Sequence, residues 1–237
     1  MTSIIETEWG FTVVGVTDLE KPVRNIPKNY RNVTGIAAHE KAKGPAMYES
    51  SLERDYQTIL EFCPEVDKYT VQPITLEWQD INKTSRSYTP DTFVLFKKNA
   101  TQGDKPWLCE IKYRNDLAEN WQELRPKFKA AIHFAKAQGW RFKIMTEVEI
   151  RTTYMINARF LLRYRSSIPE AGIMELLDVQ LKKLKESTPD ILIKAVFQDE
   201  WRQAQLIGVL WYLVATFQIG INLHQPITMD SKIWWKA

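Results

Sequence analysis

The sequence predicts an α/β protein in which a sheet is flanked by helices and is followed by a smaller second domain. Two observations support this fold class. Strand-like runs between residues 69 and 113 are separated by short polar loops, with helical periodicity before and after them. A turn-rich stretch at 166–172 then divides the chain. With 237 residues and an apolar fraction of 44%, the chain can bury a sizeable core in one large domain or two small ones.

The first elements follow from local periodicity. Residues 1–40 show no clear hydrophobic period, which predicts an extended arm with one strand near 11–16. Apolar residues recur at helical spacing from 48 to 62, and Pro64 ends that helix. Strands are expected at 69–78, 88–96 and 106–113, and Pro73 indicates an edge or a bulge in the first of them.

A helical region follows at 117–138, and it contains Pro126. Proline is favoured in the first turn of a helix, so we expect a fresh helix to begin there. Gly139 is suited to cap its end, and the next expected elements are a strand at 141–146 and a helix at 147–165.

The stretch at 166–172 contains two serines, a proline and a glycine, and is the predicted domain boundary. The expected domains are 1–165, with the arm at its start, and 169–237. The second domain should contain three helices and, at 218–235, two short strands. This is the element order of a winged helix.

The formal net charge is +3, and it is unevenly distributed. Residues 1–168 carry 25 Lys and Arg against 21 Asp and Glu, whereas residues 169–237 carry 7 against 8. A polyanionic partner therefore suits the first part. The second part is a poor electrostatic match for DNA, so protein docking through its tryptophans is favoured there.

Cys63 and Cys109 form no disulfide framework, which predicts free thiols in a reducing, cytoplasmic setting. No signal peptide is evident at the N-terminus. The apolar run at 206–223 includes polar residues, so we expect a buried helix there and no membrane span.

One group of residues could carry chemistry. Asp91 follows a proline and precedes a hydrophobic run, and Glu110 and Lys112 lie at the end of a second run. Glu110 and Lys112 are two residues apart, so their side chains leave the same face of a strand. Two carboxylates, with the carbonyl of Ile111, could hold Mg²⁺ beside a phosphate, with the lysine nearby. The alternative is a surface ion pair and a turn residue.

A third carboxylate can come from the helix before these strands. Glu49, Glu53 and Asp55 are candidates, and the first two share a helix face. The alternative is an ordinary solvated helix face, which would be favoured for all three if the strands with Asp91 and Glu110 were not present.

Several motifs in order resemble the TnsA family, the endonuclease subunits of heteromeric cut-and-paste transposases. They are Glu49-Ser50-Ser51-Leu52-Glu53-Arg54-Asp55, Gln72-Pro73, Tyr88-Thr89-Pro90-Asp91, Glu110-Ile111-Lys112-Tyr113-Arg114 and Asn120-Trp121-Gln122-Glu123-Leu124-Arg125-Pro126-Lys127-Phe128. The resemblance covers about residues 45–165. It implies a restriction-endonuclease-like mixed sheet flanked by helices and a C-terminal winged helix.

The resemblance also implies site roles. Glu53, Asp91, Glu110 and Lys112 would be catalytic, and Lys112 would orient the attacking water. Glu53, Asp91, Glu110 and the Ile111 carbonyl would bind Mg²⁺, with Mn²⁺ as a possible substitute. A basic set after the site would contact DNA phosphates; it comprises Arg114, Arg125, Lys127 and Lys129.

The implied reaction is hydrolysis of the 5′ strand at double-stranded transposon ends. The implied partners are a TnsB-like transposase and a TnsC-like AAA+ regulator, the latter binding the C-terminal domain. Such systems include CRISPR-associated transposons. Two alternatives stay open: a stand-alone restriction or repair nuclease, and a non-catalytic adaptor within a transposition complex.

Overall fold

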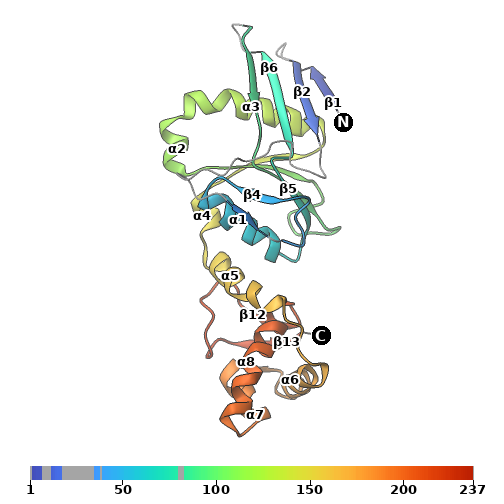
Figure 1. The fold of residues 1–237 in the computed structure, drawn as a ribbon, viewed down its shortest axis with the longest axis vertical. Helices are drawn as coiled ribbons and strands as arrows, with labels where there is room; N and C mark the ends of the chain where they lie inside the picture. Colours follow the sequence, from blue (N-terminus) through green and yellow to red (C-terminus); the bar gives the residue numbers. More distant parts are fainter. Residues whose placement is uncertain (1, 7–11, 18–34, 38, 80–82, 237) are drawn as a thin grey trace. The chain divides into compact units, whose positions relative to one another are not determined.

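The computed structural model describes residues 2–6, 12–17, 35–37, 39–79 and 83–236 (Figure 1). The chain divides into two compact units, Met1–Arg151 and Thr152–Ala237. The division lies before helix α5 (Thr153–Arg165), not at 166–172 as the turn-rich composition suggested. The reason is tertiary, because α5 packs on helix α8 (Glu200–Ala215) of the second unit.

The central sheet of the first unit is mixed, as predicted. Its strand order is β10 (Arg141–Met145), β9 (Trp107–Ile111), β8 (Thr92–Phe96) and β5 (Val66–Val71). Strands β5, β8 and β9 pair antiparallel, and β10 pairs parallel with β9. The intervening helices make the crossover that a parallel pair requires.

A second sheet has the order β1 (Thr2–Glu6), β2 (Thr12–Thr17), β6 (Ile74–Gln79) and β7 (Ser85–Tyr88). The single strand expected at 69–78 is therefore wrong, because the chain leaves the central sheet after β5 and continues in the second sheet as β6. The single strand expected at 88–96 is also wrong, because β7 ends at Tyr88 in the second sheet and the chain then re-enters the central sheet as β8. The exit lies at Gln72, which has a φ of +44°, and Pro73, which lacks the N–H that would continue a ladder.

The N-terminal arm is described only in part. The strand expected at 11–16 is present as β2, except that residue 11 lies outside the described residues, as does much of the rest of 1–40. A further strand, β3 (Gly35–Ala37), pairs antiparallel with β4 (Ala46–Tyr48).

The first unit contains helices α1 (Ser51–Phe62), α2 (Arg114–Glu119), α3 (Trp121–Ala137) and α4 (Glu147–Ile150). The break expected at Pro126 is wrong, because this proline lies inside α3. Proline has no N–H, so α3 lacks the hydrogen bond from residue 126 to the carbonyl of Gln122 near its start. The side chains of Gln122 and Pro126 are exposed to water there. Gly139 follows the end of α3 with a φ of +75°, as a helix cap requires.

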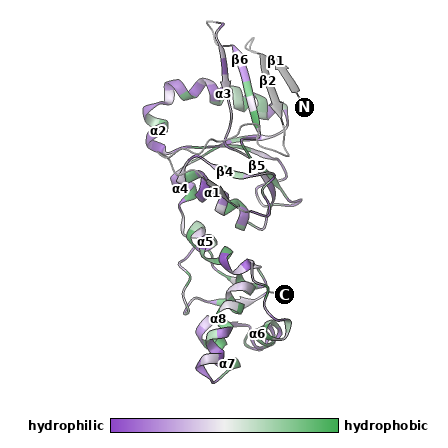
Figure 2. Cartoon of the chain, viewed as in Figure 1, coloured by the Kyte–Doolittle hydropathy of each residue, from purple (hydrophilic) through white to green (hydrophobic). Residues whose placement is uncertain are grey.

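The two faces of the central sheet are covered by different helices. Leu52, Tyr56 and Leu60 of α1 belong to one apolar cluster with the sheet. Phe128 and Phe134 of α3 belong to another, which also contains residues of β6 to β9. Hydrophilic and hydrophobic residues alternate along both helices, which is typical of helices with one buried face (Figure 2). The predicted arrangement of a mixed sheet flanked by helices is therefore confirmed.

The second unit contains α5, α8, α6 (Ala171–Leu184) and α7 (Pro189–Val196). Its sheet has the order β11 (Glu186–Ser187), β13 (Ile233–Trp235) and β12 (Ile219–Ile221). The expected terminal strands are present and pair antiparallel, but the winged helix itself stays a prediction.

In the described part of the chain, no helix has both the length and the apolar character to cross a membrane.

Candidate active site

Asp91 and Glu110 lie opposite each other on neighbouring strands. Thr92 of β8 is paired with Cys109 of β9, and continuing this antiparallel register by one residue places Asp91 opposite Glu110. The carboxylate of Asp91 is tied to the same strand, because its Oδ2 accepts a hydrogen bond of 2.6 Å from the backbone N–H of Ile111. The structure thus brings together the two carboxylates that the sequence pattern singled out.

Glu110 is buried, with 2% of its surface exposed, and it has partners on both oxygens. Oε2 accepts a hydrogen bond of 2.5 Å from the Tyr88 hydroxyl. Oε1 lies 3.1 Å from Nζ of Lys127 and 3.9 Å from Nζ of Lys112. Glu110 and Lys112 are therefore close enough to interact, as expected of side chains on one face of a strand, but a second lysine lies closer to Glu110.

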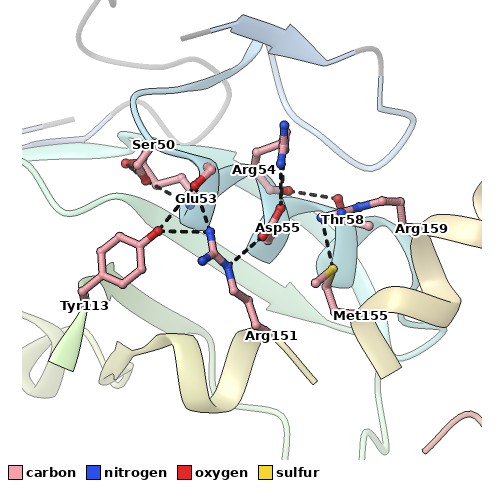
Figure 3. Close-up of polar contacts among 10 residues, drawn as sticks. Ser50, Glu53, Arg54, Asp55, Thr58, Tyr113, Arg151, Met155 and Arg159 are labelled. Carbon is pink, nitrogen blue, oxygen red and sulfur yellow. Dashed lines mark hydrogen bonds and ion pairs between the residues drawn. The ribbon is translucent and has the colours of Figure 1, made fainter. Parts of the chain in front are cut away.

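Glu53 reaches the site from the first turn of α1. Ser50 caps this helix by accepting from the N–H of Glu53, and Glu53 accepts in return from the Ser50 hydroxyl at 2.8 Å and from the Glu49 N–H at 2.9 Å (Figure 3). Burial raises the pKa of the Glu53 carboxyl, and the neighbouring charge of Glu49 adds to this, whereas that of Lys112 opposes it. Glu53 therefore lies within electrostatic reach of Lys112.

The charges of the four predicted catalytic residues act on one another. Burial raises the pKa of Asp91 well above its usual range, and the charges of Glu110 and Glu53 raise it further. The Ile111 N–H and the Lys112 ammonium act in the opposite direction. A half-buried carboxylate with an excess of neighbouring negative charge favours binding of a cation.

The donor chemistry of this site fits a hard divalent cation. In the described part of the chain, no three His, Cys, Asp or Glu side chains lie close enough to form a ready-made metal cage. Mg²⁺ needs no such cage, since it is commonly held by one or two carboxylates with water and phosphate oxygens. Asp91, Glu110 and the Ile111 carbonyl can supply these ligands. Both oxygens of Glu53 accept hydrogen bonds in the helix cap, and its role as a third ligand stays a prediction.

The other candidate on α1, Asp55, has a structural partner. Its buried carboxylate lies 3.1 Å from Nε of Arg151 and 3.2 Å from a guanidinium nitrogen of Arg54 (Figure 3). Arg151 also donates to the Ser51 hydroxyl at 2.8 Å and to the Tyr113 hydroxyl at 3.0 Å. This network ties the first turn of α1 to the residue after Lys112. Local sequence pattern does not reveal this network, because Arg151 is far from its partners along the chain.

The predicted DNA-contacting residues separate into two kinds. Arg114, Arg125 and Lys129 are exposed, as phosphate-contacting side chains should be. Lys127 is less exposed and its ammonium pairs with Glu110 inside the site, so its contact with DNA stays a prediction. Sequence reasoning also missed Tyr88, although it begins the Tyr-Thr-Pro-Asp motif that ends at Asp91.

Comparison with known families agrees with this geometry. The family described as TnsA-like endonuclease N terminal matches residues 63–147, and the family described as TnsA endonuclease C terminal matches residues 149–223. The first range contains Asp91, Glu110 and Lys112, whereas Glu53 precedes it. Among curated proteins, none matches the chain. The two matches together cover most of the chain, which therefore belongs to the TnsA family and is the endonuclease subunit of a transposase.

Proposed function

We propose that this chain is a metal-dependent DNA endonuclease that hydrolyses the 5′ strand at transposon ends within a heteromeric transposase. The observation that carries the proposal is the juxtaposition of Asp91 and Glu110 across one strand pair, with Lys112 beside them. The shared electrostatic influence of Glu53, Glu110 and Lys112 on Asp91 supports it.

Mg²⁺ bound by Asp91, Glu110 and the Ile111 carbonyl would offset the negative charge of the phosphodiester and lower the pKa of a water molecule. The protein supplies the rest. The Ile111 N–H fixes one oxygen of Asp91 and leaves the other free to point toward substrate. The side chain of Lys112 is 36% exposed, so its ammonium can reach a solvent-borne water or a phosphate oxygen while remaining near Glu110.

The exposed residues Arg114, Arg125 and Lys129 are proposed to follow the DNA backbone near the site. Contacts of this kind give salt-dependent affinity without sequence preference. Each of the three should then lower DNA affinity when it is replaced, and reduce the dependence of binding on salt.

The test is strand-specific cleavage of transposon-end DNA by the full chain with its TnsB-like partner and Mg²⁺. The wild type should cut the 5′ strand, whereas Asp91→Asn and Lys112→Ala should lose cleavage by about a hundredfold or more. Asp67→Asn, an exposed aspartate on β5, is the matched control and should cleave normally.

The other outcomes of this assay identify the alternatives. Strong cleavage without any partner would favour a stand-alone restriction or repair nuclease. Full cleavage by Asp91→Asn in the complete reaction would show that another subunit does the chemistry, and would support the adaptor alternative.

We also propose that the second unit docks a TnsC-like AAA+ regulator. Trp201 on α8 is 76% exposed, whereas Trp211 on the same helix is buried and serves the core. Exposed tryptophans are typical energetic centres of protein interfaces. Trp201→Ala in the full chain should weaken binding to the regulator, whereas Trp121→Ala, which alters an exposed tryptophan of the first unit, should not.

A further inference from the structure

Lys127 occupies an unusual position for a lysine. The buried or partly buried residues of α3 recur as a stripe at helical spacing, and this stripe includes Leu124, Phe128 and Ala131. Lys127 falls on the same stripe, and its side chain is only 23% exposed. The basic residues on either side of it, Arg125 and Lys129, are exposed.

The surroundings of the Lys127 ammonium are specific. Its Nζ lies 3.1 Å from Oε1 of Glu110, 4.7 Å from the centre of the Tyr88 ring and 5.3 Å from that of the Phe128 ring. Aromatic faces attract cations, and the attraction is stronger where water is partly excluded. The site therefore holds this ammonium against a carboxylate that we propose as a metal ligand.

Lys127 and a divalent cation compete for the same oxygen. Oε2 of Glu110 accepts from Tyr88, so Oε1 is the oxygen available to a metal ion. An ammonium 3.1 Å from that oxygen would strongly repel a divalent ion bound there. Lys112 lies farther away, at 3.9 Å, and its side chain is more exposed, so it is less of an obstacle.

We propose that Lys127 is a resident counter-cation of the metal site. It neutralises Glu110 before metal binds, and it leaves Oε1 when a divalent cation arrives, so that its ammonium becomes available to a DNA phosphate. This inference rests on the proposed function, because it takes Glu110 as a metal ligand. It assigns Lys127 a role inside the site that differs from general contact with the DNA backbone.

The experiment measures Mn²⁺ binding to the DNA-free full chain by electron paramagnetic resonance of the unbound ion. Lys127→Met removes the competing charge and should tighten Mn²⁺ binding by about tenfold, the size of one charge-assisted hydrogen bond. Lys127→Arg keeps the charge and should bind like the wild type. Lys136→Met, which alters an exposed lysine on the same helix, is the matched control and should also bind like the wild type.

A second readout tests the transfer to DNA. At saturating Mn²⁺, single-turnover cleavage by Lys127→Met with its transposase partner should be slower by about tenfold, although the metal is held more tightly. Lys127→Gln is measured in parallel, so that a folding defect of the methionine variant does not decide the result.

The failures of the two proposals differ. If the wild type binds Mn²⁺ and Asp91→Asn does not, but Lys127→Met and Lys127→Gln bind with unchanged or weaker affinity, the counter-cation role is wrong and the metal site stands. If the wild type binds no Mn²⁺ at all, the proposed metal dependence is itself wrong, and this inference falls with it.

Discussion

The backbone N–H of Ile111 donates a hydrogen bond of 2.6 Å to Oδ2 of Asp91, just beyond the last residue pair of β8 and β9, Thr92 and Cys109. This bond fixes the orientation of the carboxylate without neutralising its charge. Asp91 is half-buried, and the charges of Glu110 and Glu53 add to the desolvation that raises its pKa, so its ionisation lowers the stability of the metal-free protein.

The first prediction concerns stability against pH. Because the folded-state pKa of Asp91 is raised, the folded state binds more protons than the unfolded state from the ordinary carboxyl range up to that raised value. Stability therefore falls as the pH rises through this interval. Asp91→Asn removes this cost, so its unfolding temperature should be roughly a few degrees higher than that of the wild type at about pH 8 without metal. The difference should shrink toward about pH 4, where the wild-type carboxyl is protonated.

Thermal unfolding in EDTA and in Mg²⁺ checks this prediction. Mg²⁺ should stabilise the wild type and leave Asp91→Asn almost unchanged. Asp67→Asn should follow the wild type throughout, since Asp67 is exposed. A variant Asp91→Asn that is less stable than the wild type at both pH values would contradict the argument.

The second prediction concerns the Tyr88 hydroxyl. Tyr88→Phe leaves Oε2 of the buried Glu110 without its donor, which should cost about 1.5–3 kcal/mol in the free energy of unfolding. Tyr56→Phe is the control within the same unit, because the Tyr56 hydroxyl contacts only the Cys109 sulfur, at 3.3 Å, among its described contacts. That change should cost less than about 1 kcal/mol. Urea denaturation measures the free energy of unfolding of both variants. Equal losses would show that the hydrogen bond to Glu110 contributes no more to stability than the contact between Tyr56 and Cys109.

The third prediction concerns the network around Arg151. Removing one partner of a buried ion pair usually costs about 3–5 kcal/mol. The side chain of Arg151 is 39% exposed and Arg54 still contacts Asp55, so Arg151→Ala should cost less, about 1–3 kcal/mol. Cleavage should fall as well, because the network positions the helix that carries Glu53. Arg125→Ala, which alters an exposed arginine, should leave the stability unchanged.

Arg151→Lys separates charge from geometry in this network. A lysine cannot contact Asp55, Ser51 and Tyr113 together, so it should recover only part of the lost stability. Complete recovery of both stability and cleavage would mean that the positive charge alone suffices.

The fourth prediction concerns the thiols. Burial raises the pKa of Cys109 to about 12, and its side chain is inaccessible, whereas Cys63 is partly exposed. Iodoacetamide at about pH 8 should therefore alkylate Cys63 in the native protein and leave Cys109 unmodified. Mass spectrometry of native and urea-unfolded samples checks this, and both cysteines should react after unfolding. Native labelling of Cys109 would indicate that β9 opens more readily than its burial suggests.

Much of the fold follows from local pattern. Helix α1, strands β9 and β10 and the cap at Gly139 were predictable, because periodicity and punctuating residues act within a few positions of the chain. The exchange between two sheets near Gln72 and the continuation of α3 through Pro126 were not. They depend on pairing partners and on solvent exposure that local sequence does not encode.

Residue types and spacing alone single out Asp91, Glu110 and Lys112 as candidates for the chemistry. The folded structure shows which cations pair with the carboxylates of this region. It places Lys127 on Glu110 and Arg151 on Asp55, because the charge that a buried carboxylate meets depends on folded distances, and residues far apart along the chain supply it.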